Sequence, residues 1–282
     1  MNFSVIVPAY REKNLEELVD RILNQKLENH MKLEKIVIVA CECGDIRLIE
    51  NDKLMIIEEE KRMGKAFSIN TALKDISSDI VLLESSDTLP HKDTIQHLLE
   101  PFKDSKVGMT VSKPVPKNNR REFIGFVVNI IWSLHHKIST KHPKGGEMIA
   151  FRNVISEDIP KKLATDESYI EFMIKKLGYE ILYVPSAIVY NSGPSSISNL
   201  IKQRRRIFNG HLHIKEEYGY SVSTMDPFPI LKEVVNLFKT ETSMKKRIWI
   251  IGAVMIETWS RTLASIDFYI LKKIPYKWEM VK

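Results

Sequence analysis

The sequence is poor in cysteine, with only Cys41 and Cys43 among its 282 residues. Two cysteines separated by one residue cannot build a disulfide framework, so a reducing compartment is the simpler interpretation. A secretory leader is also missing, because residues 1–4 run straight into a strand-like segment without a basic stretch or a cleavage site. We therefore expect a cytoplasmic protein.

Long apolar runs are scarce as well. Residues 123–134 are largely apolar but too short to span a bilayer, and they predict either a core helix or a helix that lines a groove for a substrate or a lipid. Residues 248–271 are interrupted by Glu257, Arg261 and Asp267, and the first two can pair on one helix face. Because this segment is amphipathic and flanked by lysines, it lies either in a membrane interface or packed on the rest of the protein.

Positive charge is in excess, with 42 Lys and Arg against 36 Asp and Glu. The basic residues cluster at residues 117–121, 202–206, 245–247 and 272–273. Such clusters suit nucleic acid, an anionic membrane surface or phosphorylated substrates, and they also occur as plain solvated surface. We expect no nucleic-acid partner, because the sequence has no module in which basic and aromatic residues interleave.

Short β-branched runs alternate with helical periodicity in the first third of the chain. Residues 3–9 and 35–41 predict strands, and residues 12–27 between them carry Leu and Ile at helical spacing, which implies a parallel pair of strands. Further strands are expected at residues 54–58, 80–83 and 107–111, further helices at 64–73 and 165–177, and extended segments at 181–184 and 187–190. This order predicts a doubly wound, nucleotide-binding α/β sheet.

Four short motifs follow one another along this framework. They are VPAY at residues 7–10, ESSD at 84–87, TDE at 165–167 and QRRRI at 203–207. In this order they resemble the GT-A glycosyltransferases of family 2, inverting enzymes that move a sugar from a nucleotide diphosphate to an acceptor hydroxyl. The resemblance implies the GT-A fold: a Rossmann-like, doubly wound, mostly parallel sheet flanked by helices, here followed by a C-terminal amphipathic helical extension.

The resemblance also implies a division of the chain. We expect a catalytic domain over residues 1–220, with a nucleotide-sugar-binding half at 1–112 and an acceptor half at 113–220. Residues 221–282 would form the helical extension, with peripheral contact to the cytoplasmic membrane face as one of its two possible roles.

Asp87 is the expected metal ligand, since it follows the apolar segment 80–83 at the sheet edge where ligands of open α/β sheets bind. A carboxylate there can hold Mg²⁺ or Mn²⁺ bridging two phosphates. The family pattern is Asp-x-Asp, whereas this chain keeps only the last acid, and Glu84 could add a second ligand. The alternative is that Asp87 only caps the turn before Pro90.

The donor residues follow from the resemblance, which favours UDP over GDP as the nucleotide. Donor binding is assigned to Pro8, Ala9, Tyr10, Glu12, Cys41, Glu42, Asp45, Arg62, Lys65, Ser86, Asp87 and Arg206. Because Ala40 stands where the family has a base-reading acid, backbone groups, Cys41 or Glu42 would read the base. Cys41 and Cys43 are not expected to bind zinc, since no further cysteine completes a thiolate site.

Asp166 and Glu167 are the candidate general base. Counting back from Gly178 places the aspartate of the family pattern at Glu167, with Asp166 matching its glutamate. A carboxylate beside the acceptor hydroxyl can take its proton. Which of the two acids is the base stays open at this stage, as does the alternative that both only favour a helix N-terminus.

The acceptor, a saccharide or a lipid-linked molecule, is expected to contact Glu147, Gln203 and His136. Ile207 replaces the tryptophan of the family's Gln-x-x-Arg-Trp motif, which favours a non-processive enzyme. Two other functions remain as alternatives: a non-catalytic nucleotide-sugar-binding protein derived from a transferase, and a sugar-1-phosphate nucleotidyltransferase, although that class would need a glycine-rich loop after the first strand.

Overall fold

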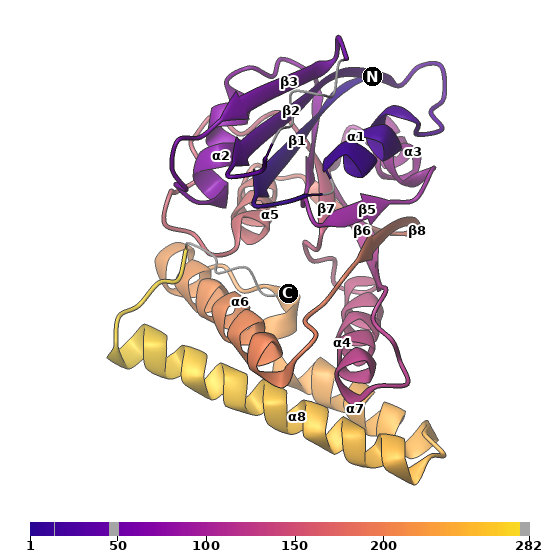
Figure 1. The fold of residues 1–282 in the computed structure, drawn as a ribbon, viewed down its shortest axis with the longest axis vertical. Helices are drawn as coiled ribbons and strands as arrows, with labels where there is room; N and C mark the ends of the chain where they lie inside the picture. The colour runs from indigo at the N-terminus through magenta and orange to yellow at the C-terminus, as the bar shows by residue number, and fades with distance from the viewer. Residues whose placement is uncertain (14, 45–50, 277–282) are drawn as a thin grey trace.

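The computed structural model describes residues 1–13, 15–44 and 51–276, which build one mixed sheet with helices on both faces and a layer of helices below it (Figure 1). The strands lie in the order β3-β2-β1-β4-β7-β6-β8-β5. Their bounds are β1 Asn2–Tyr10, β2 Lys32–Cys41, β3 Leu54–Glu58, β4 Ile80–Glu84, β5 Thr88–Pro90, β6 Val107–Pro116, β7 Met148–Arg152 and β8 Glu180–Asn191. Asp45, expected to bind the donor, lies outside the described residues.

The central strands of the sheet are parallel and are buried on both faces. β1 pairs in parallel with β2 and with β4, and Val5 stands between Ile36 and Leu82. These three side chains are 0% exposed. Strands covered on both faces are typical of parallel sheets whose crossover helices lie on either side. β7 runs antiparallel between β4 and β6, so the sheet is mixed at this point.

Two helices cover each face of the sheet. α1 (Leu15–Leu23) and α3 (Thr94–Leu99) add their buried leucines and isoleucines to one core. α2 (Lys65–Leu73) and α5 (Asp166–Lys176) complete the other. Because the two cores are independent apolar layers, the sheet between them is held rigidly, and its strand ends are fixed platforms for side chains.

The remaining helices form the layer below the sheet in Figure 1. They are α4 Phe123–Ser139, α6 Ile197–Tyr218, α7 Pro227–Thr240 and α8 Met244–Ser265, with a π-helical turn η4 Ile266–Ile270 after α8 and short 3-10 turns at Glu100–Lys103 (η2) and Ser223–Met225 (η3). α8 packs along α6. Within the ranges described, no helix is long and apolar enough to cross a membrane.

The expected doubly wound, mostly parallel sheet is confirmed, with differences at three places. The helix expected over residues 12–27 is only Leu15–Leu23, and the extended segments 181–184 and 187–190 are one strand, β8. The predictions did not include β5, α3 or α6, and they covered α7 only as part of the helical extension over residues 221–282. The pairing of Glu257 with Arg261 is confirmed at 2.8 Å.

Candidate active site

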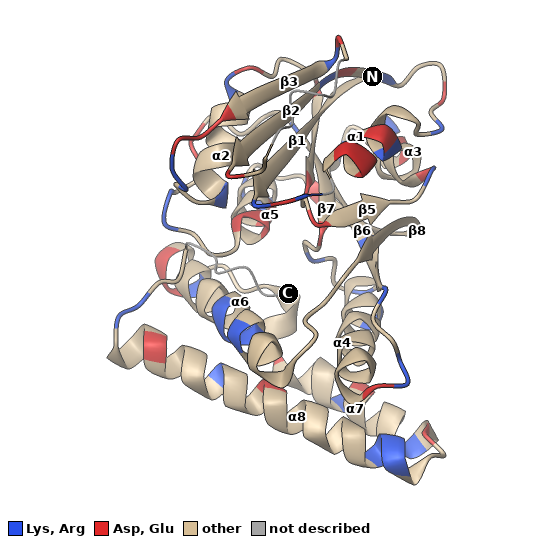
Figure 2. Ribbon diagram, in the orientation of Figure 1, with Lys and Arg blue, Asp and Glu red and all other residues tan. Residues whose placement is uncertain are grey.

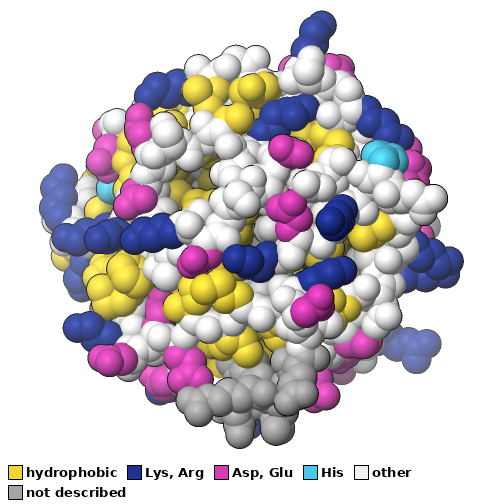
Figure 3. Space-filling view, turned by 90° about the horizontal axis from the view of Figure 1, so that it is seen from above, with side chains coloured by type: hydrophobic (Ala, Val, Ile, Leu, Met, Phe, Trp, Pro, Cys, Tyr) yellow, Lys and Arg dark blue, Asp and Glu magenta, His cyan; other side chains and the backbone are white. Residues whose placement is uncertain are grey.

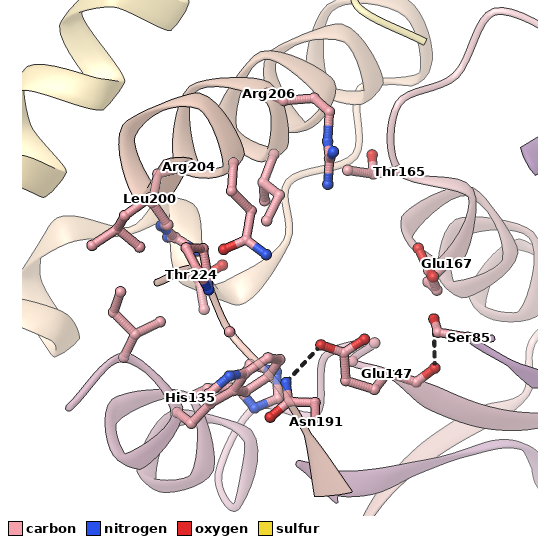
Figure 4. A pocket seen from close by; sticks show the side chains of 18 of the residues that line it. Ser85, His135, Glu147, Thr165, Glu167, Asn191, Leu200, Arg204, Arg206 and Thr224 are labelled. Carbon is pink, nitrogen blue, oxygen red and sulfur yellow. Dashed lines mark hydrogen bonds between the residues drawn. The ribbon is translucent and has the colours of Figure 1, made fainter. Parts of the chain in front are cut away.

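A cavity of about 560 Å³ lies between the strand ends and the lower helices. Its upper wall comes from the carboxyl ends of β1, β2 and β4 and from the start of α5, and its lower wall from α4, α6, α7 and α8. Figure 4 shows the acids and arginines of these elements pointing into the same space from opposite sides. Ligands of open α/β sheets bind at this edge.

The first loop supplies a flat aromatic surface. Pro8, Ala9 and Tyr10 end β1 at the cavity wall. The Arg62 guanidinium lies 4.0 Å from the centroid of the Tyr10 ring, so the two side chains stack. Gly64 has a φ of 111°, which side chains with a Cβ rarely adopt, and this turn places Lys65 at the first position of α2 facing the cavity.

Lys65 binds both acids at the start of α5. Its ammonium lies 3.1 Å from the Asp166 carboxylate and also forms an ion pair with Glu167. Glu167 lines the cavity, whereas Asp166 is 1% exposed and lies behind the wall. Gly145 packs on this pair from β7's side, since a Cβ at position 145 would lie 3.0 Å from that of Glu167.

Burial and charge oppose one another in this cluster. Burial raises the pKa of Asp166 to about 6, and the charge of Glu167 adds to the rise, while Lys65 acts against it. Burial alone would lower the pKa of Lys65, but the charges of Asp166 and Glu167 outweigh it and raise that pKa. Lys65 therefore stays protonated and keeps a positive charge against Glu167.

Asp87 follows β4 and is reached by solvent inside the cavity. The protein atoms around it raise the pKa of its carboxyl by excluding water, and the charge of Glu12 adds to this effect. Glu84, considered as a second metal ligand, is instead 0% exposed, does not line the cavity and accepts a hydrogen bond from the Thr88 hydroxyl at 2.5 Å. Burial raises the pKa of Glu84 well above its ordinary value.

Glu147 stands at the floor of the cavity, just before β7. Its carboxylate accepts a hydrogen bond from the Asn191 side chain at 2.9 Å, and its backbone carbonyl accepts one from the Ser85 hydroxyl at 3.4 Å (Figure 4). Burial raises the pKa of Glu147 to about 7, and the neighbouring charge of Asp87 contributes next. A negative charge is therefore unfavourable here unless a cation joins it.

Arg206 reaches into the cavity from α6, with its guanidinium beside Thr165 (Figure 4). Burial lowers the pKa of Arg206 to about 10, and the charges of Glu167, Asp87 and Glu147 act against this fall. The guanidinium is therefore charged at neutral pH and faces three acids. Gln203, one turn earlier on α6, lines the same wall.

Most of the residues predicted from the sequence meet at this cavity. Those on its wall are Pro8, Ala9, Tyr10, Glu12, Cys41, Arg62, Lys65, Ser86, Asp87, Glu147, Glu167, Gln203 and Arg206. Glu42 is not on the wall; it is exposed and pairs with Arg11 at 2.6 Å. His136 is not on the wall either, since its ring bonds the Tyr183 hydroxyl at 2.9 Å.

His135, which the predictions passed over, takes the place expected of His136. It lines the cavity, is 8% exposed, and both ring nitrogens are without a hydrogen bond of ordinary geometry. Burial lowers its pKa to about 3, so the ring is neutral and can donate or accept a hydrogen bond. A signal for it exists in the sequence, because Val128, Ile131, His135 and Ile138 recur at helical spacing and all line the cavity.

The donor atoms of the site suit a hard divalent cation. No cluster of three or more His, Cys, Asp and Glu that could hold a metal occurs in the part of the chain that the structure describes. Mg²⁺ and Mn²⁺, however, are often held by one or two carboxylates together with substrate phosphates. Asp87 and Glu147 would offer this arrangement, and a bound cation would offset the burial and the charge of Asp87 that raise the pKa of Glu147.

A model of the family described as "Glycosyltransferase like family 2" matches residues 1–210. The chain is similar to the poly-beta-1,6-N-acetyl-D-glucosamine synthase of Staphylococcus aureus (strain COL), with 23% identity over 246 residues that cover 80% of this chain and 58% of that protein. The synthase of Staphylococcus epidermidis is 24% identical over 198 residues, 65% of this chain and 45% of that protein. The chain thus spans about half the length of these curated relatives.

Two solved structures share the fold. The mannosyltransferase PcManGT from Pyrobaculum calidifontis, in complex with GDP-Man and Mn²⁺, gives a TM-score of 0.65 at 19% identity over 96% of this chain and 88% of that one. The glucosyl-3-phosphoglycerate synthase of Mycobacterium tuberculosis, in complex with Mn²⁺, UDP and phosphoglyceric acid, gives 0.50 at 14% identity over 75% and 78%. With the match to the family model, these likenesses establish that the chain belongs to glycosyltransferase family 2 and has the GT-A fold.

Proposed function

We propose that this chain transfers a sugar from a nucleotide-diphosphate sugar to an acceptor hydroxyl, with inversion at the anomeric carbon. The observation that carries the proposal is the set of side chains that line the cavity. The upper wall offers the stacked Tyr10 and Arg62, a carboxylate for a cation, Asp87, and a carboxylate for a proton, Glu167. Glycosyl transfer from such a donor needs these groups within reach of one sugar.

Glu167 is proposed as the general base and Asp166 as a positioning residue. Glu167 reaches the cavity, whereas Asp166 is buried behind it and shares the Lys65 ammonium. The Glu167 carboxylate takes the proton of the acceptor hydroxyl while the hydroxyl oxygen bonds to the anomeric carbon. The bond from that carbon to the diphosphate breaks on the opposite side, and its electron pair stays on the diphosphate oxygen, which gives inversion.

Positive side chains stabilise the departing diphosphate. Arg206 is charged at neutral pH and lies among the acids of the site, so its positive charge would act on the phosphate oxygens of a bound donor. Asp87, with Glu147 beside it, would hold Mg²⁺ or Mn²⁺, which when bound supplies further positive charge to the two phosphates. Arg62 adds charge next to the base-stacking surface.

For the nucleotide and the acceptor, the proposal keeps the sequence-based expectations. UDP is favoured by the motif resemblance, although the solved relatives include complexes with both GDP-Man and UDP. A saccharide or lipid-linked acceptor would meet Gln203, Glu147 and the neutral His135. Ile207 lines the cavity where a stacking tryptophan is absent, which supports a single transfer rather than polymerisation.

A nucleotide panel tests this proposal. Thermal unfolding should be shifted upward by one nucleoside diphosphate among UDP, GDP and CDP, and further upward when Mn²⁺ is present. The corresponding nucleotide sugars should then release nucleoside diphosphate when candidate acceptors are added. If a nucleotide binds but no sugar is ever transferred, the non-catalytic alternative replaces the proposal. If pyrophosphate is released instead, the nucleotidyltransferase alternative does.

A further inference from the structure

The helical extension carries most of the large apolar side chains that are exposed to solvent. Of the seventeen exposed large hydrophobic side chains among the described residues, fourteen lie between Phe228 and Leu271. Nine of them form one stripe along α7 and one along α8, at intervals of three and four residues. The α7 stripe consists of Phe228, Leu231, Val235 and Phe238, and the α8 stripe of Met244, Ile248, Ile251, Met255 and Trp259. We name these two stripes the apolar face.

The polar side of α8 is turned inward and fixed there by ion pairs. Arg204 of α6 donates two hydrogen bonds to Glu257, at 2.7 and 2.9 Å. Arg205 pairs with Asp267, which is 6% exposed. An amphipathic helix on a water-soluble protein normally buries its apolar side, so α8 has the reverse orientation.

The exposed charges around the apolar face are lysines, apart from Asp226 just before α7. Between positions 227 and 273 the charged side chains exposed to solvent are all lysines, at positions 232, 239, 245, 246, 272 and 273. The acids of this stretch are buried or half-buried, and Glu233 is paired with Lys137. Figure 2 shows basic residues at the N-terminal end of α8 and in the segment after its C-terminal end, whereas the opposite end of the molecule in Figure 3 carries charges of both signs. An apolar stripe rimmed by lysines complements an anionic, apolar surface.

The cavity opens toward this face. Leu231 and Val254 both line the cavity and are more than 40% exposed on the extension. Between them and the acids, the wall is largely apolar and includes Val128, Ile131 and Ile250. The apolar end of the cavity therefore adjoins the apolar face. A lipid-linked acceptor could enter the cavity from a bilayer while its acyl chain stays near α7 and α8.

We infer that α7 and α8 rest on an anionic lipid bilayer, with α8 lying along its surface and its apolar stripe at the boundary between headgroups and acyl chains. The lysines at the ends of α8 contact lipid phosphates. A second copy of the chain fits this face less well, because it would bring two sets of lysines together. The delivery of an acceptor from the bilayer rests on the proposed function, whereas the docking itself does not.

Vesicle flotation tests the inference with the whole chain. The protein should float with vesicles of phosphatidylcholine and phosphatidylglycerol, float less with phosphatidylcholine alone, and detach as salt rises. The double variant Met255→Asp/Trp259→Asp should partition at least about tenfold less, since two exposed apolar side chains lose their lipid contacts. Leu177→Asp is the matched control, because Leu177 is 47% exposed and lies on α5's C-terminus, away from the extension; it should float like the wild type.

Two results would overturn the inference. One is wild-type protein that stays unbound to either kind of vesicle. The other is a dimer in light scattering that the double variant turns into monomer, since a second copy would then occupy the face. Nucleotide-induced thermal shifts are measured in parallel without vesicles. They test the proposed function alone, so a failure of membrane binding can be told apart from a failure of nucleotide binding.

Discussion

The Lys65 ammonium joins both acids of the first turn of α5, contacting Glu167 and lying 3.1 Å from Asp166. The ion pair between Lys65 and Glu167 connects α2 and α5, which lie on the same side of the sheet, across 102 residues of sequence. Its charges are almost enclosed, with side-chain exposures of 12% for Lys65 and 2% for Asp166. It therefore serves both the stability of the fold and the charge of the proposed base.

Lys65→Met should destabilise the fold, because Asp166 would keep a buried charge without its cation. Removing one partner of a buried pair costs about 3–5 kcal/mol, which should appear as a lower urea midpoint. Lys61→Met is the control, since Lys61 is exposed. The double variant Lys65→Met/Asp166→Asn should recover part of the loss. A Lys65→Met midpoint equal to that of the wild type would contradict the role given to the pair.

Glu147 should make the protein less stable as the pH rises. Its pKa is raised from 4.5 to about 7 by burial, so the folded state binds a proton that the unfolded state has lost between these values. The stability it contributes is fully present below pH 4.5 and is lost as the pH rises through about 7. Glu147→Gln should therefore show a flatter dependence of the urea midpoint on pH across this window. Parallel curves for the two proteins would show that Glu147 titrates normally.

Asp87→Asn should abolish the part of donor binding that depends on metal. The wild type should gain an extra thermal shift when Mn²⁺ is added with its nucleotide, because under the proposed function Asp87 would help to hold the ion. The variant should keep the metal-free shift and lose the increment. Asp75→Asn, at an exposed position, serves as the control. An unchanged Mn²⁺ increment would remove Asp87 from the metal site.

Arg206→Gln should lower turnover more than donor affinity. The guanidinium acts on charge that grows as the diphosphate leaves, and loss of one such donor costs about 10²–10³ in kcat. Arg206→Lys should recover a part of this, since it keeps the charge but not the planar fork. If both variants instead changed only the KM for the donor, Arg206 would be a binding residue of the ground state.

Much of the fold could be predicted from the sequence because its central strands are buried on both faces and are therefore continuous apolar runs. β8 was expected as two segments because Pro185 and Ser186 interrupt its apolar pattern. Its pairing with β6 shifts register at the same place, between Tyr183 and Ile188, yet the two paired stretches form one irregular strand. The bounds of α7 were not predicted within the expected helical extension, and none of its residues is fully buried.

The site could be predicted where a residue directly follows a strand or begins a helix, as with Asp87, Lys65 and Glu167. The site could not be predicted at positions where a shift of one residue along a helix changes which way a side chain points. His135 and His136 are adjacent in sequence, but a helix turns by about 100° per residue, so only one can face the cavity. The backbone of Glu42, with a φ of 55°, similarly leaves its side chain beside Arg11.

The central claim is that Glu167 takes the proton of the acceptor, and one comparison tests it most directly. Glu167→Gln, Glu16→Gln and the wild type are assayed side by side for nucleotide-induced thermal shift and for sugar transfer, Glu16 being an exposed acid on α1. The account predicts that Glu167→Gln keeps the thermal shift and loses about 10²–10⁴-fold in transfer rate, while Glu16→Gln matches the wild type. Transfer by Glu167→Gln at the wild-type rate would contradict it.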